Sequence, residues 1–174
     1  MHTLRATFCA ALISVVSAGT DAHAASCPAA RATASVTELR GALLCQHNRA
    51  RDRNGLGPLR EDPSLRKAAQ GHASHMVSAG FMTHTTPAGT TLLERLRSAG
   101  YVRPGDRFLV GENLAYRLGA AATPAPIFRR WMRSPEHRAD ILSAAFRDVG
   151  IGAARGTPTG ATGLTLAITF GVRR

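Results

Sequence analysis

The spacing of apolar side chains along the first half of the chain predicts two amphipathic helices. Between Ser35 and Asn54, and again between Asp62 and Gly80, apolar or small residues recur every three or four positions, the period of a helix with one buried face. Ser35 is followed three residues later by a glutamate, which makes a capping box, and Asp62 precedes a proline at the first helical position.

Three shorter helices are expected further along the chain. Thr91 opens another capping box, and Gly100 closes that helix. A fourth helix begins at Thr123-Pro124 and a fifth at Ser134-Pro135, where the serine hydroxyl is expected to cap the first turn.

Strand-like alternation of apolar and small residues fills the remaining segments. Residues 107–115 are expected to form one strand, and residues 149–154 and 164–170 two more, joined by a Gly-rich hairpin that makes the last two antiparallel. Helices before and between strands favour an α/β fold, a three-layer α-β-α sandwich with a small, mainly antiparallel central sheet.

The N-terminus has the pattern of a secretory signal peptide over residues 1–24. A weakly basic start leads into an apolar run over residues 6–18 and then into Ala22-His23-Ala24, a small-x-small cleavage site. The run is shorter than the roughly 20 residues of a membrane-spanning helix, and no second long apolar stretch follows. We therefore expect a secreted or envelope protein without a transmembrane segment, made of an N-terminal arm (residues 25–34) and one domain (residues 35–174).

Two cysteines remain after the expected cleavage, Cys27 and Cys45. In an oxidising compartment two such residues are expected to form a disulfide that ties the arm to the first helix. Lipidation of Cys27 is the alternative, although Ala24 stands where a lipidation site usually has leucine.

The formal net charge is +11, from 22 basic and 11 acidic residues. A protein this basic is expected to associate with anionic surfaces, which outside a bacterial cell are wall polymers and lipid headgroups. Nucleic acid is not an expected partner, because aromatic residues make up 5% of the chain and the basic residues are scattered. The alternative is a solvated arginine-rich surface without a partner. We expect a monomer.

Six segments in order resemble the CAP superfamily (cysteine-rich secretory, antigen 5, pathogenesis-related 1) in its bacterial secreted form. The resemblance covers about residues 36–171 and implies the α-β-α fold. Asn48 and Arg51, in the first segment, are expected to hold the first helix against the following loop. The segments are QHNRAR and NGLGPL (46–51 and 54–59), FMTH with TTPAG (81–89), GENLA (111–115), WMRSPEHR with IL (131–138 and 141–142), FRDVGIG (146–152) and TFG (169–171).

The resemblance also implies a cleft of two histidines and two acids that in some family members holds a divalent cation. The matching positions are His84, Glu112 and His137. The second acid departs from the pattern, because Ser134 stands in its place and only Glu136 lies nearby. We expect the first three residues to converge on one cleft, with His84 and His137 as ligands of a cation such as zinc.

Three hypotheses about function follow from these expectations. The first is a binding module that acts at the cell envelope or outside the cell. The alternative is a metal-dependent hydrolase of cell-wall, peptide or lipid substrate, in which Glu112 is the base and His84 and His137 hold the ion or polarise a bond. The absent second acid favours binding. A third hypothesis is an envelope protein whose main property is its stability and whose cleft no longer has a function.

A nucleophilic enzyme is disfavoured, because both cysteines are expected to be oxidised and the chain has no G-x-S-x-G or H-E-x-x-H motif.

Overall fold

A computed structural model describes residues 26–173 of the chain. The predicted signal peptide lies outside these residues. The described part contains five helices and four strands, in the order α1 (Val36–Asp52), β1 (Arg60–Glu61), α2 (Pro63–Ala79), α3 (Leu92–Ala99), β2 (Phe108–Leu118), α4 (Pro124–Arg133), α5 (Pro135–Ile141), β3 (Asp148–Arg155) and β4 (Gly163–Arg173).

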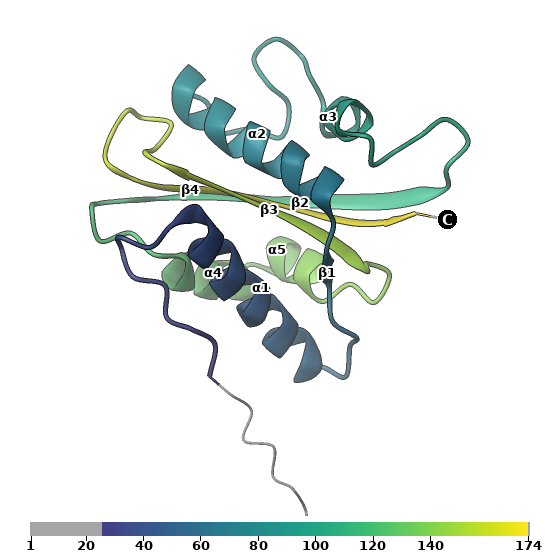
Figure 1. The fold of residues 1–174 in the computed structure, drawn as a ribbon, viewed down its shortest axis with the longest axis horizontal. Helices are drawn as coiled ribbons and strands as arrows, with labels where there is room; N and C mark the ends of the chain where they lie inside the picture. Colours follow the sequence, from purple (N-terminus) through teal and green to yellow (C-terminus); the bar gives the residue numbers. More distant parts are fainter. Residues whose placement is uncertain (1–25, 174) are drawn as a thin grey trace, which may run out of the picture.

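The strands form one mixed sheet in the order β1-β3-β4-β2. β4 pairs antiparallel with β3 and β2, and the two-residue strand β1, which the sequence pattern did not predict, pairs parallel with β3. Helices α2 and α3 cover one face, and α1, α4 and α5 cover the other (Figure 1). The predicted α-β-α sandwich with a mainly antiparallel sheet is confirmed, and β2 lies at one of its edges.

The two faces of the sheet are packed differently. Large side chains fill the space toward α1, α4 and α5, including Trp131 and Phe170, which are buried. Toward α2 the sheet presents small residues, because Gly150 and Gly152 of β3 lie directly against the backbone of that helix. The alternation predicted for residues 149–154 is therefore confirmed, with the large side chains on one face and the small residues on the other.

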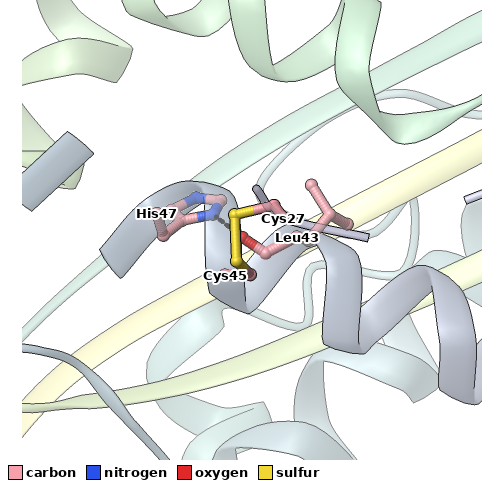
Figure 2. The surroundings of a disulfide bond; sticks show 4 residues. All are labelled: Cys27, Leu43, Cys45 and His47. Atoms are coloured by element: carbon pink, nitrogen blue, oxygen red, sulfur yellow. Dashed lines mark hydrogen bonds between the residues drawn. A yellow bond between two sulfur atoms is a disulfide. The ribbon is translucent and has the colours of Figure 1, made fainter. Parts of the chain in front are cut away.

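The predicted disulfide is present between Cys27 and Cys45, whose Cα atoms are 5.6 Å apart (Figure 2). It closes a loop of 18 residues and joins the irregular N-terminal arm to α1. With its sulfur in this bond, Cys27 has no free thiol for lipidation.

His47 lies one turn of α1 beyond Leu43 and is completely buried (Figure 2). Its Nδ1–H donates a hydrogen bond to the Leu43 carbonyl at 2.7 Å, and its ring packs edge-on against Phe128 with centroids 4.9 Å apart. Nε2 has no hydrogen-bond partner among the described residues. Burial lowers the pKa of His47 to about 4, so the ring is neutral at pH 7.

This buried histidine is expected to make the fold sensitive to acid. Its pKa is lower in the folded chain than in the unfolded chain, so its contribution is complete above pH 6.5 and is lost as the pH falls toward 4. The loss amounts to about 3 kcal/mol. We expect His47→Phe to reduce the difference in unfolding free energy between pH 7 and pH 4 by about this amount, measured by urea unfolding. The same pH dependence in both proteins would contradict a neutral, buried ring.

Within the described residues, every helix is too short or too polar to cross a membrane.

Candidate functional site

A buried ion pair between β2 and α3 forms the centre of the candidate site. The Glu112 side chain is 2% exposed, and its two carboxylate oxygens accept hydrogen bonds from Nη2 of Arg95 at 2.9 and 3.0 Å. Arg95 is itself 10% exposed, and its Nη1 donates to the backbone carbonyl of His84 at 2.8 Å. A carboxylate buried at this depth needs a counter-charge, and Arg95 supplies it.

His84, on the loop after α2, reaches the same carboxylate from the solvent side. Its Nδ1 lies 3.0 Å from Oε2 of Glu112, and its side chain is 63% exposed. The hydrogen bond to Glu112 raises the pKa of His84, helped by the charge of that carboxylate and opposed by partial burial and Arg95. The protonated ring and its contact with Glu112 are therefore favoured at low pH and are lost as the pH rises through this raised pKa.

A second imidazole, that of His72 on α2, lies near Glu112 on the buried side of the carboxylate. It is fully buried, with Nε2 3.9 Å from the carboxylate and 3.0 Å from the Thr83 carbonyl, to which it donates. Burial lowers the pKa of His72 despite the nearby carboxylate, so this ring is neutral. Glu112 thus faces one permanent cation, one titrating ring and one neutral ring.

His137 is positioned by α5, on the opposite side of β2. Its Nδ1 and the Ser134 hydroxyl oxygen lie 2.8 Å apart, and its ring stacks on Trp131 with centroids 6.4 Å apart. Asn113 of β2 donates to the His137 carbonyl at 3.0 Å and so fixes α5 to the edge strand. The expectation that the Ser134 hydroxyl caps the first turn is wrong: Ser134 occupies the cap position, but its side chain makes no capping bond, because it is paired with the ring of His137.

Asp140 of α5 is a further acid near the site, and it was not among the predicted site residues. It lies against Gly111, where a Cβ atom would come within 2.9 Å of its Oδ1. Burial raises the pKa of Asp140, and the charges of His137 and His84 act in the opposite direction. Both imidazoles are therefore close enough to Asp140 to influence its titration.

Of the four predicted cleft residues, the structure brings His84 and Glu112 into direct contact. Among the described residues His137 makes no hydrogen bond or ion pair with that pair, and the charges of both imidazoles act on Asp140. Glu136 is exposed, and no hydrogen bond or ion pair among the described residues links it to the others. Convergence of the three on a single cleft stays a prediction.

Two site residues that were not predicted, Arg95 and Asp140, lie at positions that the sequence pattern could have indicated. Arg95 lies on the same helical stripe as Leu92, Leu96 and Ala99, so a charged residue occupies an apolar face. Asp140 follows His137 by three residues, which places the two on one side of a helix.

This donor set does not fit a divalent cation. No group of three or more His, Cys, Asp or Glu side chains within residues 26–173 is arranged to hold a metal ion. The Glu112 oxygens accept bonds from Arg95, while Nδ1 of His84 faces Glu112 and Nδ1 of His137 faces Ser134. The fixed positive charge of Arg95 beside the carboxylate is the main obstacle to a cation.

A groove of about 780 Å³ runs along the edge strand beside His137. One wall is the consecutive stretch Leu114–Leu118 of β2, and the other is formed by α4 and the start of α5. Arg117 and Arg130 are exposed at this groove, and none of the described residues that line it is acidic. The remaining lining residues are Met82, Trp131, Ser134 and His137.

The α-β-α fold of this chain is shared with a known family of domains. The profile of the cysteine-rich secretory protein family, CAP, matches residues 44–170. The chain therefore belongs to this family. A curated relative, the uncharacterized protein YkwD of Bacillus subtilis (strain 168), is 28% identical over 107 residues, which make up 60% of this chain and 38% of that protein. The matched part is thus well under half of the relative's length.

Solved structures share the fold at low sequence identity. An outer surface protein of Borrelia burgdorferi superposes with a TM-score of 0.67 at 20% identity, covering 84% of this chain and all of that one. An extracellular protein containing an SCP domain from Bacillus anthracis str. Ames gives a TM-score of 0.62 at 21% identity, over 78% of this chain and 43% of that one.

Proposed function

We propose that this protein is a secreted CAP-domain binding module that engages an anionic polymer of the cell wall through the groove beside β2. The observation that carries the proposal is the composition of this groove, where Arg117, Arg130 and His137 meet no acidic side chain among the described lining residues. Such a site attracts anionic groups, and the net charge of +11 brings them toward the whole molecule.

An extracellular location is consistent with two further features. A disulfide between Cys27 and Cys45 persists in oxidising compartments outside the cytoplasm. The Bacillus anthracis and Borrelia burgdorferi proteins that share the fold are described as extracellular and outer surface proteins.

The state of Glu112 favours binding over hydrolysis. A general base needs a free lone pair within reach of the proton that it removes. Arg95 contacts both oxygens of this carboxylate and His84 contacts one, while the side chain is 2% exposed. Because the carboxylate is buried, a substrate water has little access to the lone pair that remains, and this favours binding over hydrolysis.

Replacing both groove arginines is expected to weaken binding to wall polymer. Arg117→Gln with Arg130→Gln removes two exposed positive charges from the groove, and we expect about a tenfold loss of affinity for cell walls that carry their anionic polymer. The measurement is sedimentation of the purified protein with such walls at several salt concentrations. Binding of the unchanged protein should fall steeply with salt, because exposed charges are screened over about 8 Å at physiological ionic strength.

The matched control is Arg53→Gln with Arg103→Gln, which makes the same charge change at exposed positions outside the groove. We expect the control to retain most of the binding. Equal losses in both double variants would show that net charge alone is responsible and would contradict a groove-based site. Release of soluble wall fragments, abolished by Glu112→Gln, would support the hydrolase alternative instead.

A further inference from the structure

We propose that Arg95 is the resident cation of the site formed by His84 and Glu112, and that it occupies the place beside the carboxylate that a divalent metal ion would take. The site is then independent of metal in this protein. The proposal concerns residues away from the anionic groove, so its outcome is separate from that of the polymer-binding test.

The first argument is the geometry of the ion pair. Nη2 of Arg95 lies 2.9 and 3.0 Å from the two oxygens of Glu112, so both oxygens share one donor group. The guanidinium is charged at every accessible pH. A metal ion that bound this carboxylate would come into close contact with a fixed positive charge, and little solvent is present to screen the repulsion, since Glu112 is 2% exposed.

The second argument is that Arg95 is held in place by other groups. Its Nη1 donates to the His84 carbonyl at 2.8 Å and to the Thr90 carbonyl at 3.4 Å. These bonds tie the guanidinium to two points of the loop that carries His84 and leads into α3. Displacing Arg95 to admit a metal would break the contacts to Glu112 and to these carbonyls together.

The third argument concerns His84, the ring that would provide a metal-binding nitrogen. Its Nδ1 faces Oε2 of Glu112 at 3.0 Å, so this nitrogen and this carboxylate oxygen already point toward each other. With Arg95 shortened to an uncharged side chain, the two would form a pair of zinc ligands beside the vacated space, and water would complete the coordination. Removal of the charge of Arg95 should therefore convert a metal-free site into a zinc-binding one.

The test compares melting temperatures of the purified protein with zinc chloride and with a chelator. We expect the unchanged protein to melt at the same temperature in both. Arg95→Met is expected to melt lower, because its buried carboxylate has lost its counter-charge, and to regain about 5 °C or more with saturating zinc. The gain should disappear in Arg95→Met with His84→Ala. Arg97→Met, an exposed change on the same helix, should behave as the unchanged protein does.

Two results would overturn the proposal. One is a zinc-dependent rise in the melting temperature of the unchanged protein that His84→Ala removes. The other is an Arg95→Met variant whose melting temperature zinc does not move. If Arg95→Met does not fold without metal, the folded fraction after refolding with and without zinc is the readout. Zinc should increase that fraction in a His84-dependent way, and equal fractions would also overturn the proposal.

Discussion

Gly152→Ala is expected to destabilise the protein by about 4 kcal/mol or more. A Cβ atom at this position of β3 would lie 2.2 Å from the Ala69 carbonyl oxygen and 2.6 Å from the Gln70 nitrogen, both in the backbone of α2. Contacts this short do not occur in folded proteins, and a helix backbone cannot move aside as a flexible side chain can. The helix would have to shift away from the sheet and lose its packing.

Gly150, two residues earlier on β3, also has no room for a side chain. A Cβ at Gly150 would lie 2.1 Å from the backbone of Leu65. Two successive turns of α2 therefore rest directly on β3, and each contact requires the absence of a side chain. This close approach also brings His72, one turn further along α2, to within 3.9 Å of Glu112.

The control for these changes is Gly71→Ala, on α2 itself. A Cβ there would meet nothing within 4 Å, and the residue is exposed. Alanine in a helix interior is favoured over glycine by roughly 0.5–1 kcal/mol, so this variant should be slightly more stable. The measurement is the free energy of unfolding from urea titration for Gly150→Ala, Gly152→Ala and Gly71→Ala. Similar stability for Gly152→Ala and the unchanged protein would contradict the backbone contact.

The sequence predicted the elements of the fold because their signals are local. Capping boxes at Ser35 and Thr91 are present as expected, each with its serine or threonine and its glutamate bonded reciprocally. Strand β1 has only two residues, so it has no period to detect. The small residues at alternate positions of β3 predicted a strand, but their spacing alone did not show that a helix backbone lies against them.

The candidate site was predicted less completely, because its contacts join residues far apart in the chain. His84 and Glu112 are 28 residues apart and were identified through the resemblance to a family rather than through spacing. Arg95 was missed because a single arginine in a helix is usually solvent-exposed. Its burial depends on the approach of α3 to β2, which a local pattern does not report. Ser134 was expected to bond to the backbone, and its partner is instead the ring of His137.

Arg51→Ala is expected to destabilise the protein by about 4 kcal/mol, because it leaves several buried carbonyl groups without a donor and a cavity in place of a large side chain. Arg51 is a fully buried residue of α1. Its Nε donates to the Gly57 carbonyl at 2.8 Å, and its Nη1 donates to the carbonyls of Ile141 and Ser143, each at 2.9 Å. Nη2 donates to the Phe146 carbonyl at 3.3 Å.

These bonds explain why the effect should also reach the functional site. The prediction that Arg51 holds α1 against the following loop is confirmed by its bond to Gly57, and its other bonds join α1 to the end of α5, 90 and more residues away. Asp140 and His137 lie on that same helix. A chain without Arg51 should therefore lose order at the end of α5 before it unfolds globally, and amide hydrogen exchange should be faster there.

Two substitutions distinguish this network from a general effect of arginine removal. Arg53→Ala, two residues along the chain at an exposed position, should change the free energy of unfolding by less than about 0.5 kcal/mol. Arg51→Lys keeps the charge but offers a compact ammonium in place of the planar fork, so it cannot satisfy acceptors spread over four residues and should recover only part of the loss. If Arg51→Lys were as stable as the unchanged protein in urea unfolding, the buried charge rather than the geometry of the guanidinium would hold these segments together.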